Sequence, residues 1–253
     1  QVSEYTTVTY YTTNPDCNYY TLTVSGENGT TTGGGSYLSG TTATLTAASN
    51  TCYEFTGWSD GDTSNPRTVT VTGDATYTAV FQAFTYTISY AAGANGSGTV
   101  ASTTKTCGVD AVLQSNTFSR TGYTQTGWSE TDGGTKAYDL GASYTADEAK
   151  TLYPYWTPNT NTAYTVYHRQ EQLDGSYVTV DTDNMSGTTG ASVTPAVKSY
   201  TGFTAPATQT VTIAADGSTT VTYQYTRNSY ALTWDGNNGV LSGVYTNGNV
   251  KYG

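Results

Sequence analysis

The 253-residue chain has few charged residues, and most of its charges are negative. Lys and Arg number nine against nineteen Asp and Glu, for a formal net charge of −10 at pH 7. A protein that binds nucleic acid needs clustered cations to neutralise phosphates, and here the cations are scattered, so nucleic acid is excluded as a partner. An anionic membrane surface is disfavoured for the same reason. No apolar run approaches the ~20 residues that span a bilayer, so we expect no membrane insertion in this segment.

Residue types that carry catalysis are also scarce. His168 is the only histidine, which excludes a histidine cluster for zinc and leaves potential nucleophiles without a partner base. Its neighbours Arg169–Glu171 are polar, which predicts an exposed histidine at a strand end. We therefore expect no enzyme, with no catalytic residue, no cofactor-binding residue and no cofactor.

Two pairs of carboxylates are the candidate metal ligands. Asp60 with Asp62, and Asp181 with Asp183, offer hard oxygen ligands at short spacing, as calcium loops do. Neither pair is followed by the terminal Glu of a full calcium loop, and both lie where turns are expected. The sequence therefore favours turns over a metal site.

The chain is rich in glycine, tyrosine and threonine, which often alternate with apolar residues. It has 28 Gly and 24 Tyr but a single Met, so little material remains for amphipathic helices. Aromatic and β-branched residues at alternating positions are typical of half-buried strands. The composition therefore predicts a mainly β fold.

An aromatic block that ends in Gly-Trp recurs along the chain. It reads YEFTGWSD at Tyr53–Asp60, GYTQTGWSE at Gly122–Glu130 and, more distantly, YTGFTA at Tyr200–Ala205. Each copy follows an alternating run that a glycine opens, namely Gly40, Gly108 or Gly190. The spacing of about 70 residues exceeds that of stacked solenoid repeats. We therefore expect tandem small domains, each with a core of its own.

The turns between alternating runs divide the chain into five segments. Residues 1–13 contain a lone strand, Glu4–Thr12, which is the last strand of a preceding repeat or an exchange arm. Residues 14–82, 83–158 and 159–229 are three repeats, called here the first, second and third repeat. Residues 230–253 begin a further repeat without its aromatic block, so we expect the window to be cut from a longer array. Gln1–Tyr10 alternates instead of forming an apolar segment, which predicts no signal peptide in this window.

Large aromatic residues of the repeats are the predicted structural residues, because each buries much surface in a small core. They are Trp58, Trp128, Phe55, Tyr123, Phe203, Trp156 and Trp234. Four tyrosines near predicted turns are expected to be exposed, where they suit sugar stacking or protein contacts: Tyr19, Tyr37, Tyr138 and Tyr245.

One segment of the second repeat carries a helical signal. Gly141–Lys150 includes Thr145 and Glu148 in the arrangement of a capping box, in which the hydroxyl and the carboxylate satisfy backbone donors. The segment is therefore predicted to form a short helix.

The three cysteines favour an exported protein over a cytosolic one. Cys17 and Cys52 each precede a predicted strand of the first repeat, so the candidate disulfide is Cys17–Cys52, although their separation cannot be read from the sequence. Cys107 would then be a free thiol or an intermolecular link.

The motifs resemble repeats of bacterial surface proteins. Tyr20–Phe81, with GTTATLTA, EFTGWSDG and NPRTVTVTGD, resembles the divergent InlB B-repeat family. Thr85–Trp156, with TGYTQTGWSE and ADEAKTLYPYW, resembles the Listeria–Bacteroides repeat family. Tyr164–Thr226 more loosely resembles the MucBP-like repeats of cell-wall adhesins, and there Thr204 and Ala205 are expected to replace the Gly-Trp pair.

The resemblance implies extracellular modules with small β-grasp-like or Ig-like domains arranged end to end, and it transfers no catalytic or ligand residue. Some bacterial stalk domains also carry Lys–Asn isopeptide links, for which the candidates are Lys105, Lys136, Lys150 and Lys198.

Three functions fit this picture. The first is a non-enzymatic stalk or adhesin segment at the bacterial cell surface or in a secreted protein. The second is a subunit of an extracellular filament assembled by strand exchange between neighbours. The third is a glycan-binding module that uses exposed Tyr. The expected partners are neighbouring repeats of the same chain or like subunits, with a host glycan or protein as a further partner.

Overall fold

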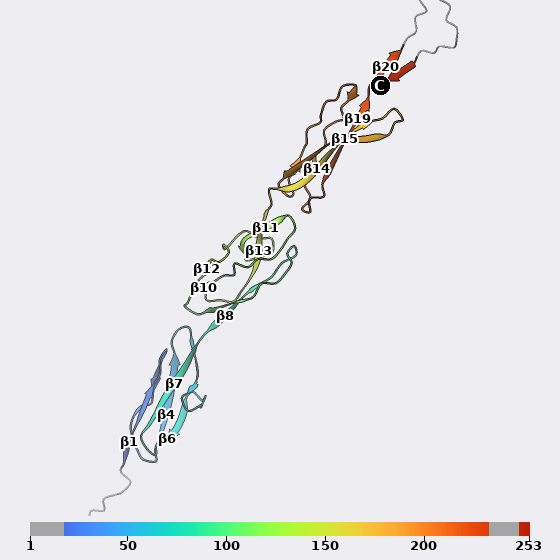
Figure 1. Cartoon of the computed structure of the whole chain (residues 1–253). Helices are drawn as coiled ribbons and strands as arrows, with labels where there is room; N and C mark the ends of the chain where they lie inside the picture. The colour runs from blue at the N-terminus through green and yellow to red at the C-terminus, as the bar shows by residue number, and fades with distance from the viewer. Residues whose placement is uncertain (1–17, 233–247) are drawn as a thin grey trace, which may run out of the picture. The chain divides into compact units, whose positions relative to one another are not determined.

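The computed structural model describes residues 18–232 and 248–253, and every regular element in these residues is a β-strand (Figure 1). The predicted mainly β fold of tandem small repeat domains is therefore confirmed. The strand predicted at Glu4–Thr12, and also Cys17, Trp234 and Tyr245, lie outside the described residues.

The chain packs as two compact units. Among the described residues, the first contains those up to Ile88 together with Thr103–Leu113 and Ser143–Lys150. The second contains Ser89–Ser102, Gln114–Ala142 and the described residues from Thr151 onward. The second repeat therefore contributes strands to both units.

The first repeat consists of two sheets. A four-stranded sheet has the order β3-β1-β7-β5, with the strands β1 (Tyr19–Ser25), β3 (Gly35–Leu38), β5 (Tyr53–Trp58) and β7 (Ala75–Ala83). A three-stranded sheet has the order β2-β4-β6, with the strands β2 (Gly29–Thr32), β4 (Thr42–Ser49) and β6 (Arg67–Thr70). Strands β1 and β7 pair in parallel and the others are antiparallel. Alternate apolar residues point into one buried cluster: Leu22, Ala43, Leu45, Trp58, Val69, Val71 and Ala79.

The main sheet of the second repeat has the order β11-β13-β8-β9, and a separate pair joins β10 to β12. Strand β8 (Thr85–Tyr90) is antiparallel to β9 (Thr103–Thr106), and β10 (Ala111–Val112) is antiparallel to β12 (Ser143–Tyr144). Strand β11 (Tyr123–Ser129) is antiparallel to β13 (Lys150–Pro158). Trp128 is fully buried, and its indole N–H donates to the carbonyl of Gln114 at 2.9 Å. Its ring lies 4.5 Å from Tyr90 and 6.1 Å from Phe118, centroid to centroid.

The third repeat repeats the parallel pairing of first and last strands. Its main sheet has the order β15-β14-β19-β17, with the strands β14 (Thr162–Glu171), β15 (Tyr177–Gly187), β17 (Phe203–Thr204) and β19 (Thr220–Arg227). Strand β14 pairs in parallel with β19, as β1 does with β7. A second pair joins β16 (Ser192–Val193) to β18 (Val211–Thr212). The core consists of Tyr164, Val166, Ile213, Val221, Tyr223 and Tyr225. Beyond it, β20 (Ser229–Leu232) is antiparallel to β21 (Gly248–Lys251).

The glycine of the Gly-Trp motif lies at a β-bulge. The register of β5 on β7 shifts between Phe55 and Gly57, and that of β11 on β13 shifts between Gln125 and Gly127. A bulge re-aims the following side chain, and in both strands the next residue is the buried tryptophan. A Cβ on Gly127 would lie 2.5 Å from the carbonyl oxygen of Tyr138, so the close approach also requires glycine.

Two sequence predictions about elements are wrong. The segment Gly141–Lys150 forms no helix, because Tyr144 is buried in strand β12 opposite Ala111 and the chain continues irregularly to β13. The third aromatic block is also shifted by three residues. Phe203, the first residue of β17, pairs near the end of β19 as Tyr53 pairs with β7, so the place of Tyr53 is taken by Phe203 and not by Tyr200.

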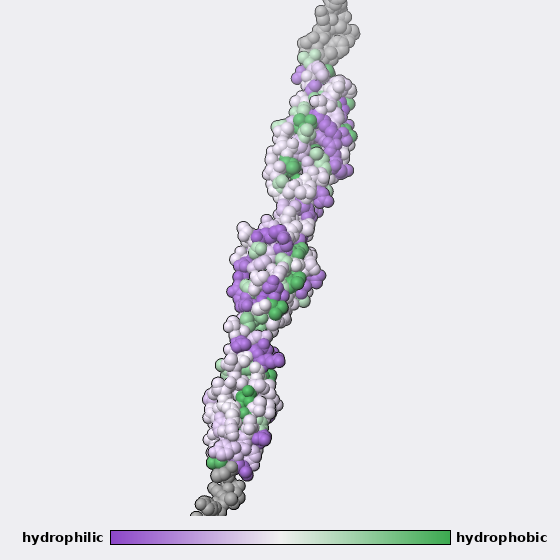
Figure 2. Space-filling view, turned by 90° about the vertical axis from the view of Figure 1, so that its left-hand side faces the viewer, coloured by the Kyte–Doolittle hydropathy of each residue, from purple (hydrophilic) through white to green (hydrophobic). Residues whose placement is uncertain are grey.

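The described surface is mixed in polarity. Figure 2 shows hydrophobic residues scattered among hydrophilic ones on the face in view. Scattered apolar residues of this kind are normal on soluble surfaces and do not indicate a binding site by themselves. In the part of the chain that the structure describes, no helix has the length and apolar character to cross a membrane.

Candidate functional site

A disulfide joins consecutive repeats. Cys52 immediately precedes β5 of the first repeat, and Cys107 immediately follows β9 of the second. Their Cα atoms lie 5.3 Å apart, within the usual range for a disulfide, and 55 residues separate them in sequence. The bond therefore closes a loop that contains the end of one repeat and the beginning of the next.

This pairing replaces the one expected from sequence. Cys52 was the candidate partner of Cys17, with Cys107 left over, and the structure instead bonds Cys52 to Cys107. The physical reason is that β7 and β8 are separated by Phe84 alone, so the first strands of the second repeat begin beside the end of the first. Sequence separation along the chain did not indicate this proximity.

The backbone of Phe84 connects both cysteines. Its N–H donates to the carbonyl of Cys52 at 2.9 Å, and its carbonyl accepts from the N–H of Cys107, also at 2.9 Å. Two backbone hydrogen bonds thus hold the cysteine positions together, independently of the sulfur atoms.

Cys52 has a backbone conformation that normally belongs to glycine. Its φ is +72°, in the left-handed region, where a side chain costs on the order of 1–2 kcal/mol. The equivalent residues before β11 and β17 are both glycine, Gly122 with φ of +74° and Gly202 with φ of +81°. A cysteine at this position is therefore explained by the bond it forms and not by local propensity.

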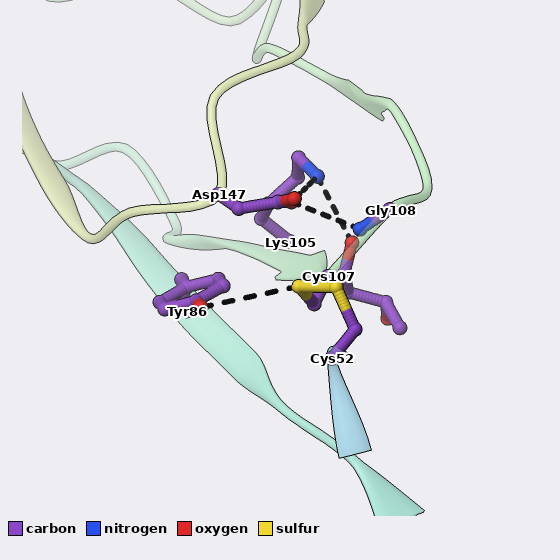
Figure 3. The surroundings of a disulfide bond; sticks show 7 residues. Cys52, Tyr86, Lys105, Cys107, Gly108 and Asp147 are labelled. Atoms are coloured by element: carbon purple, nitrogen blue, oxygen red, sulfur yellow. Dashed lines mark hydrogen bonds and ion pairs between the residues drawn. A yellow bond between two sulfur atoms is a disulfide. The ribbon is translucent and has the colours of Figure 1, made fainter. Parts of the chain in front are cut away.

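An ion pair between a buried lysine and a partly exposed aspartate lies beside the disulfide, as Figure 3 shows. The side chain of Lys105 is fully buried, and its Nζ donates to Asp147 Oδ1 at 2.5 Å and to the Thr106 carbonyl at 3.0 Å. The same carboxylate oxygen accepts from the N–H of Gly108 at 2.9 Å. The hydrogen bond from Lys105, with that from Gly108, holds the pKa of Asp147 below its ordinary value. Asp147 was predicted to lie in a helix, and it instead ties its loop to β9 and to the residue after Cys107.

This corner of the structure also contains the only grouping of three potential metal ligands found among the described residues. Cys52, Cys107 and Asp147 offer ligand atoms within 4.8 Å of one another. The two sulfur atoms are joined to each other, and metal binding by cysteine requires free thiolates. The arrangement is that of a structural disulfide with a neighbouring carboxylate.

The first carboxylate pair binds an arginine. Arg67 makes a two-pronged contact with Asp60, at 2.7 and 2.9 Å, and its Nε lies 3.4 Å from Asp62 Oδ2. The hydrogen bond from Arg67 lowers the pKa of Asp60, and the backbone N–H of Ser64 is the main cause that lowers the pKa of Asp62. The carboxylates thus serve the turn between β5 and β6.

The second carboxylate pair belongs to a polar network on β15. Nζ of Lys198 donates to Asp181 at 2.6 Å and to Asp183 at 2.7 Å. These hydrogen bonds are the first cause of the lowered pKa of both carboxyls and of a Lys198 pKa raised above its usual range. Asp183 also lies 3.2 Å from Nε2 of His168, whose Nδ1 lies 2.8 Å from the Tyr225 hydroxyl.

His168 is therefore not the exposed residue expected from its neighbours. Its side chain is fully buried in the middle of β14, between Tyr223 and Tyr225 on the adjacent strand. Alternation along β14 turns it inward with Tyr164 and Val166. Both ring nitrogens have partners within the fold, so the residue contributes to the packing of the third repeat.

The other predicted residues take structural places. The aromatic side chains expected in the cores differ in their exposure to solvent. Trp58 and Trp128 are buried, whereas four others are half-buried: Phe55, Tyr123, Phe203 and Trp156. Of the tyrosines expected at the surface, Tyr19 is exposed, whereas Tyr37 and Tyr138 are half-buried and donate to Gly33 and Glu130. The four candidate isopeptide lysines each form an ion pair with a carboxylate: Lys105, Lys136, Lys150 and Lys198.

The alignment of the repeats contains a sequence signal for the disulfide. Aligning the aromatic blocks places Cys52 where the second copy has Gly122, directly before the aromatic residue. Aligning the glycines that open the preceding runs places Cys107 directly before Gly108, as Thr189 precedes Gly190. Each cysteine thus replaces the residue that another copy of the repeat has at the same place, which singles out Cys52 and Cys107 as a candidate pair.

Comparison with known families agrees with this geometry. Residues 20–85 match the divergent InlB B-repeat domain, and residues 86–154 match the Listeria-Bacteroides repeat domain. No family model covers the third repeat, so its likeness to MucBP-like repeats stays a prediction. No curated protein matches the chain. The boundary between the two matched domains falls between residues 85 and 86, and the disulfide crosses it.

Both families are repeats of bacterial surface proteins and are typical of non-catalytic segments. The chain therefore contains a divergent InlB B-repeat domain followed by a Listeria-Bacteroides repeat domain, both of the kind found in bacterial surface proteins.

Proposed function

We propose that this segment is a non-enzymatic extracellular stalk of a bacterial surface or secreted protein, in which a covalent bond secures one repeat to the next. The observation that carries the proposal is the Cys52–Cys107 disulfide across the domain boundary. A bond within one domain would stabilise that domain alone. A bond between domains transmits tension from one to the other without relying on their separate cores.

Small repeat domains need such support. A domain of this size has a core that supplies only modest stability. Closing a loop over a separation of 55 residues stabilises the folded state by about 4 kcal/mol in the chain-entropy model of disulfides. The same bond favours a location outside the cytoplasm, where thiols are oxidised and disulfides persist.

The composition of the chain and the lining of its groove support a non-enzymatic extracellular segment. The nine Lys and Arg leave few cleavage sites for trypsin-like proteases, which suits an exposed extracellular segment. A groove of about 550 Å³ on the first repeat contains no histidine or cysteine, and Glu27 is its only carboxylate: its lining is Ser25, Gly26, Glu27, Asn28, Thr78, Ala79, Val80 and Phe81. This lining offers no set of groups for acid–base or nucleophilic catalysis.

Small-angle scattering over a concentration series, with negative-stain images of the same samples, tests the proposal. A stalk gives elongated single chains whose dimensions do not change with concentration. Growth into ordered filaments would overturn it in favour of strand exchange between subunits, and deleting residues 1–13 should then abolish assembly. Binding of a defined sugar on a glycan array, lost when Tyr19 is replaced by Ala, would instead favour the glycan-binding module.

A further inference from the structure

The junction that carries the disulfide recurs twice more in the described chain. At each junction, the residue directly before the aromatic strand has a left-handed backbone. We call it the acceptor residue, and it is Cys52 before β5, Gly122 before β11 and Gly202 before β17. The three φ values lie between +72° and +81°, so the chain enters the aromatic strand with the same turn each time.

The residue that directly follows the last strand of a repeat contacts each acceptor residue. This linker residue is Phe84, Asn159 or Asn228. Its N–H donates to the carbonyl of the acceptor residue at 2.9 Å in all three junctions. The linker residue is therefore bound to the repeat that it leaves.

The carbonyl of each linker residue binds the next repeat. It accepts from the N–H of a return residue, which is Cys107, Thr189 or Tyr252, and the distance is again 2.9 Å at each junction. The return residue comes after the first antiparallel strand pair of the following repeat, which is β8–β9, β14–β15 or β20–β21. Asn18 and Ser39 repeat this second hydrogen bond at 2.8 Å at the start of the first repeat.

A glycine follows every return residue. Gly108 and Gly190 have φ of +72° and +77°, and Gly40, after Ser39, has +79°. These are the glycines that open the alternating runs in the sequence. Their recurrence has a conformational reason, because the chain must turn away from the junction in a left-handed conformation.

The side chains show how each junction is reinforced. At the second junction, the hydroxyl of Thr124 donates to Asn159 Oδ1 at 2.7 Å, and at the third the hydroxyl of Thr204 donates to Asn228 Oδ1 at 2.7 Å. The first junction has Phe84 as its linker residue, which cannot accept such a bond. It has the disulfide between its acceptor and return residues instead.

We propose that acceptor, linker and return residues form one interaction surface, repeated at each junction, that docks the first strand pair of a repeat onto the preceding repeat in a single register. The partner is the next repeat of the same chain, and the disulfide locks a joint that forms without it. This inference goes beyond the proposed function, because a stalk, a filament subunit and a binding module could all be joined in this way.

Transplanting the disulfide tests the proposal. The variant is Gly202→Cys with Tyr252→Cys, in a chain that also carries Cys17→Ser and keeps Cys52 and Cys107. The third junction is preferred because the three atoms nearest to a Cβ on Gly202 all belong to the ring of Tyr252, which the second substitution removes. A Cβ on Gly122 would instead lie 2.6 Å from a backbone oxygen of Ala215.

The matched control is Gly202→Cys with Lys251→Cys, because the neighbouring residue of a strand points to the opposite face. Both proteins are oxidised in the same glutathione buffer, and intact mass and thiol alkylation are followed with time. The expected result is a second intramolecular disulfide in the test variant, seen as the loss of two further hydrogens, well before any appears in the control. If a folded test variant stays reduced, or oxidises no faster than the control, the proposal is wrong.

A second measurement decides the matter if the transplanted pair prevents folding. The native cysteines are replaced by the residues of the second junction, as Cys52→Gly with Cys107→Thr, and amide hydrogen exchange is measured. The proposal expects the amide of Phe84 to remain protected to the same degree as the amides of Asn159 and Asn228, which make the equivalent hydrogen bonds. Exchange of Phe84 at the rate of an unstructured peptide would show that the disulfide, and not the joint, holds the first junction together.

Discussion

At the scale of single residues, Cys52 has a backbone conformation that cysteine disfavours, and it forms the disulfide there. Its backbone has the left-handed conformation for which the equivalent repeats use glycine, so the backbone is strained at this residue. The disulfide compensates for the free energy of this strain. Once the disulfide is absent, only the strain remains.

Two variants that both carry Cys107→Thr isolate the strain at residue 52. Cys52→Gly should be more stable than Cys52→Ala by about 1 kcal/mol, because a Cβ at positive φ costs more than the backbone entropy that alanine saves. Urea unfolding followed through the amide resonances of β5 and β7 measures the difference. Equal stability, or a more stable alanine variant, would show that the position is unstrained.

The ion pair beside the disulfide gives a second prediction. Asp147→Asn should destabilise the protein more than Lys105→Met does. The first change leaves a buried ammonium without its countercharge, whereas the second leaves a carboxylate that is more than a third exposed to water. Urea midpoints of the two single variants, compared with the parent, test the order. A larger loss for Lys105→Met would mean that the lysine's alkyl chain, and not its charge, matters at this site.

At the scale of elements, the Gly-Trp motif is a bulge that turns the tryptophan into the core. Gly127→Ala should therefore destabilise the second repeat by roughly 1–3 kcal/mol, because the added Cβ would lie 2.5 Å from a backbone oxygen of Tyr138. Gly73→Ala is the control, since no atom lies within 4 Å of a Cβ there and its φ is not left-handed. Thermal unfolding of both variants, followed by indole fluorescence, compares them, and equal melting temperatures would contradict the account of the bulge.

The network on β15 gives the third repeat a characteristic pH dependence. The pKa values of Asp181 and Asp183 are lowered in the folded state. Their contribution to the free energy of unfolding is therefore complete above the unfolded pKa of about 3.9, and it is lost as the pH falls through the folded pKa values. The pKa of Lys198 is instead raised in the folded state. Its contribution to the free energy of unfolding is therefore complete below the unfolded value of about 10.4 and is lost only as the pH rises above it.

We therefore expect the urea midpoint of the third repeat, read from β14 and β19 amide resonances, to fall below about pH 4. Lys198→Met should flatten or reverse this acid dependence, because the two carboxylates then repel each other until they are protonated. An unchanged acid slope in Lys198→Met would show that other carboxylates set it.

The sequence predicted elements better than it predicted their partners. Alternation identified strands such as β1, β7 and β14 because half-burial leaves a period of two in the residue types. It failed at Gly141–Lys150, where a capping-box pattern was overridden by the burial of Tyr144 and by the contacts of Asp147. The partner of Cys52 and the burial of His168 depend on which strands become neighbours, and a local pattern does not contain that information.

At the scale of the whole molecule, the disulfide changes how the chain responds to force. When the protein is pulled from its ends, the loop between Cys52 and Cys107 is shielded for as long as the bond is intact. Complete unfolding of the oxidised chain should therefore release about 190 Å less length than unfolding of the reduced chain, from a separation of 55 residues at up to ~3.5 Å each. Single-molecule pulling with and without reductant tests this, and equal lengths would show that the two cysteines are not bonded.

The central claim is that Cys52 is bonded to Cys107 across the repeat boundary, and peptide mapping of the unreduced protein tests it most directly. Trypsin alone leaves Cys17 and Cys52 in one peptide, because Arg67 is the first basic residue. Adding a glutamate-specific protease cuts after Glu27 and Glu54 and separates them. The account predicts that residues 28–54 are linked to residues 106–120 and separate on reduction. A link from either peptide to Cys17, or a free thiol at Cys107, would contradict it.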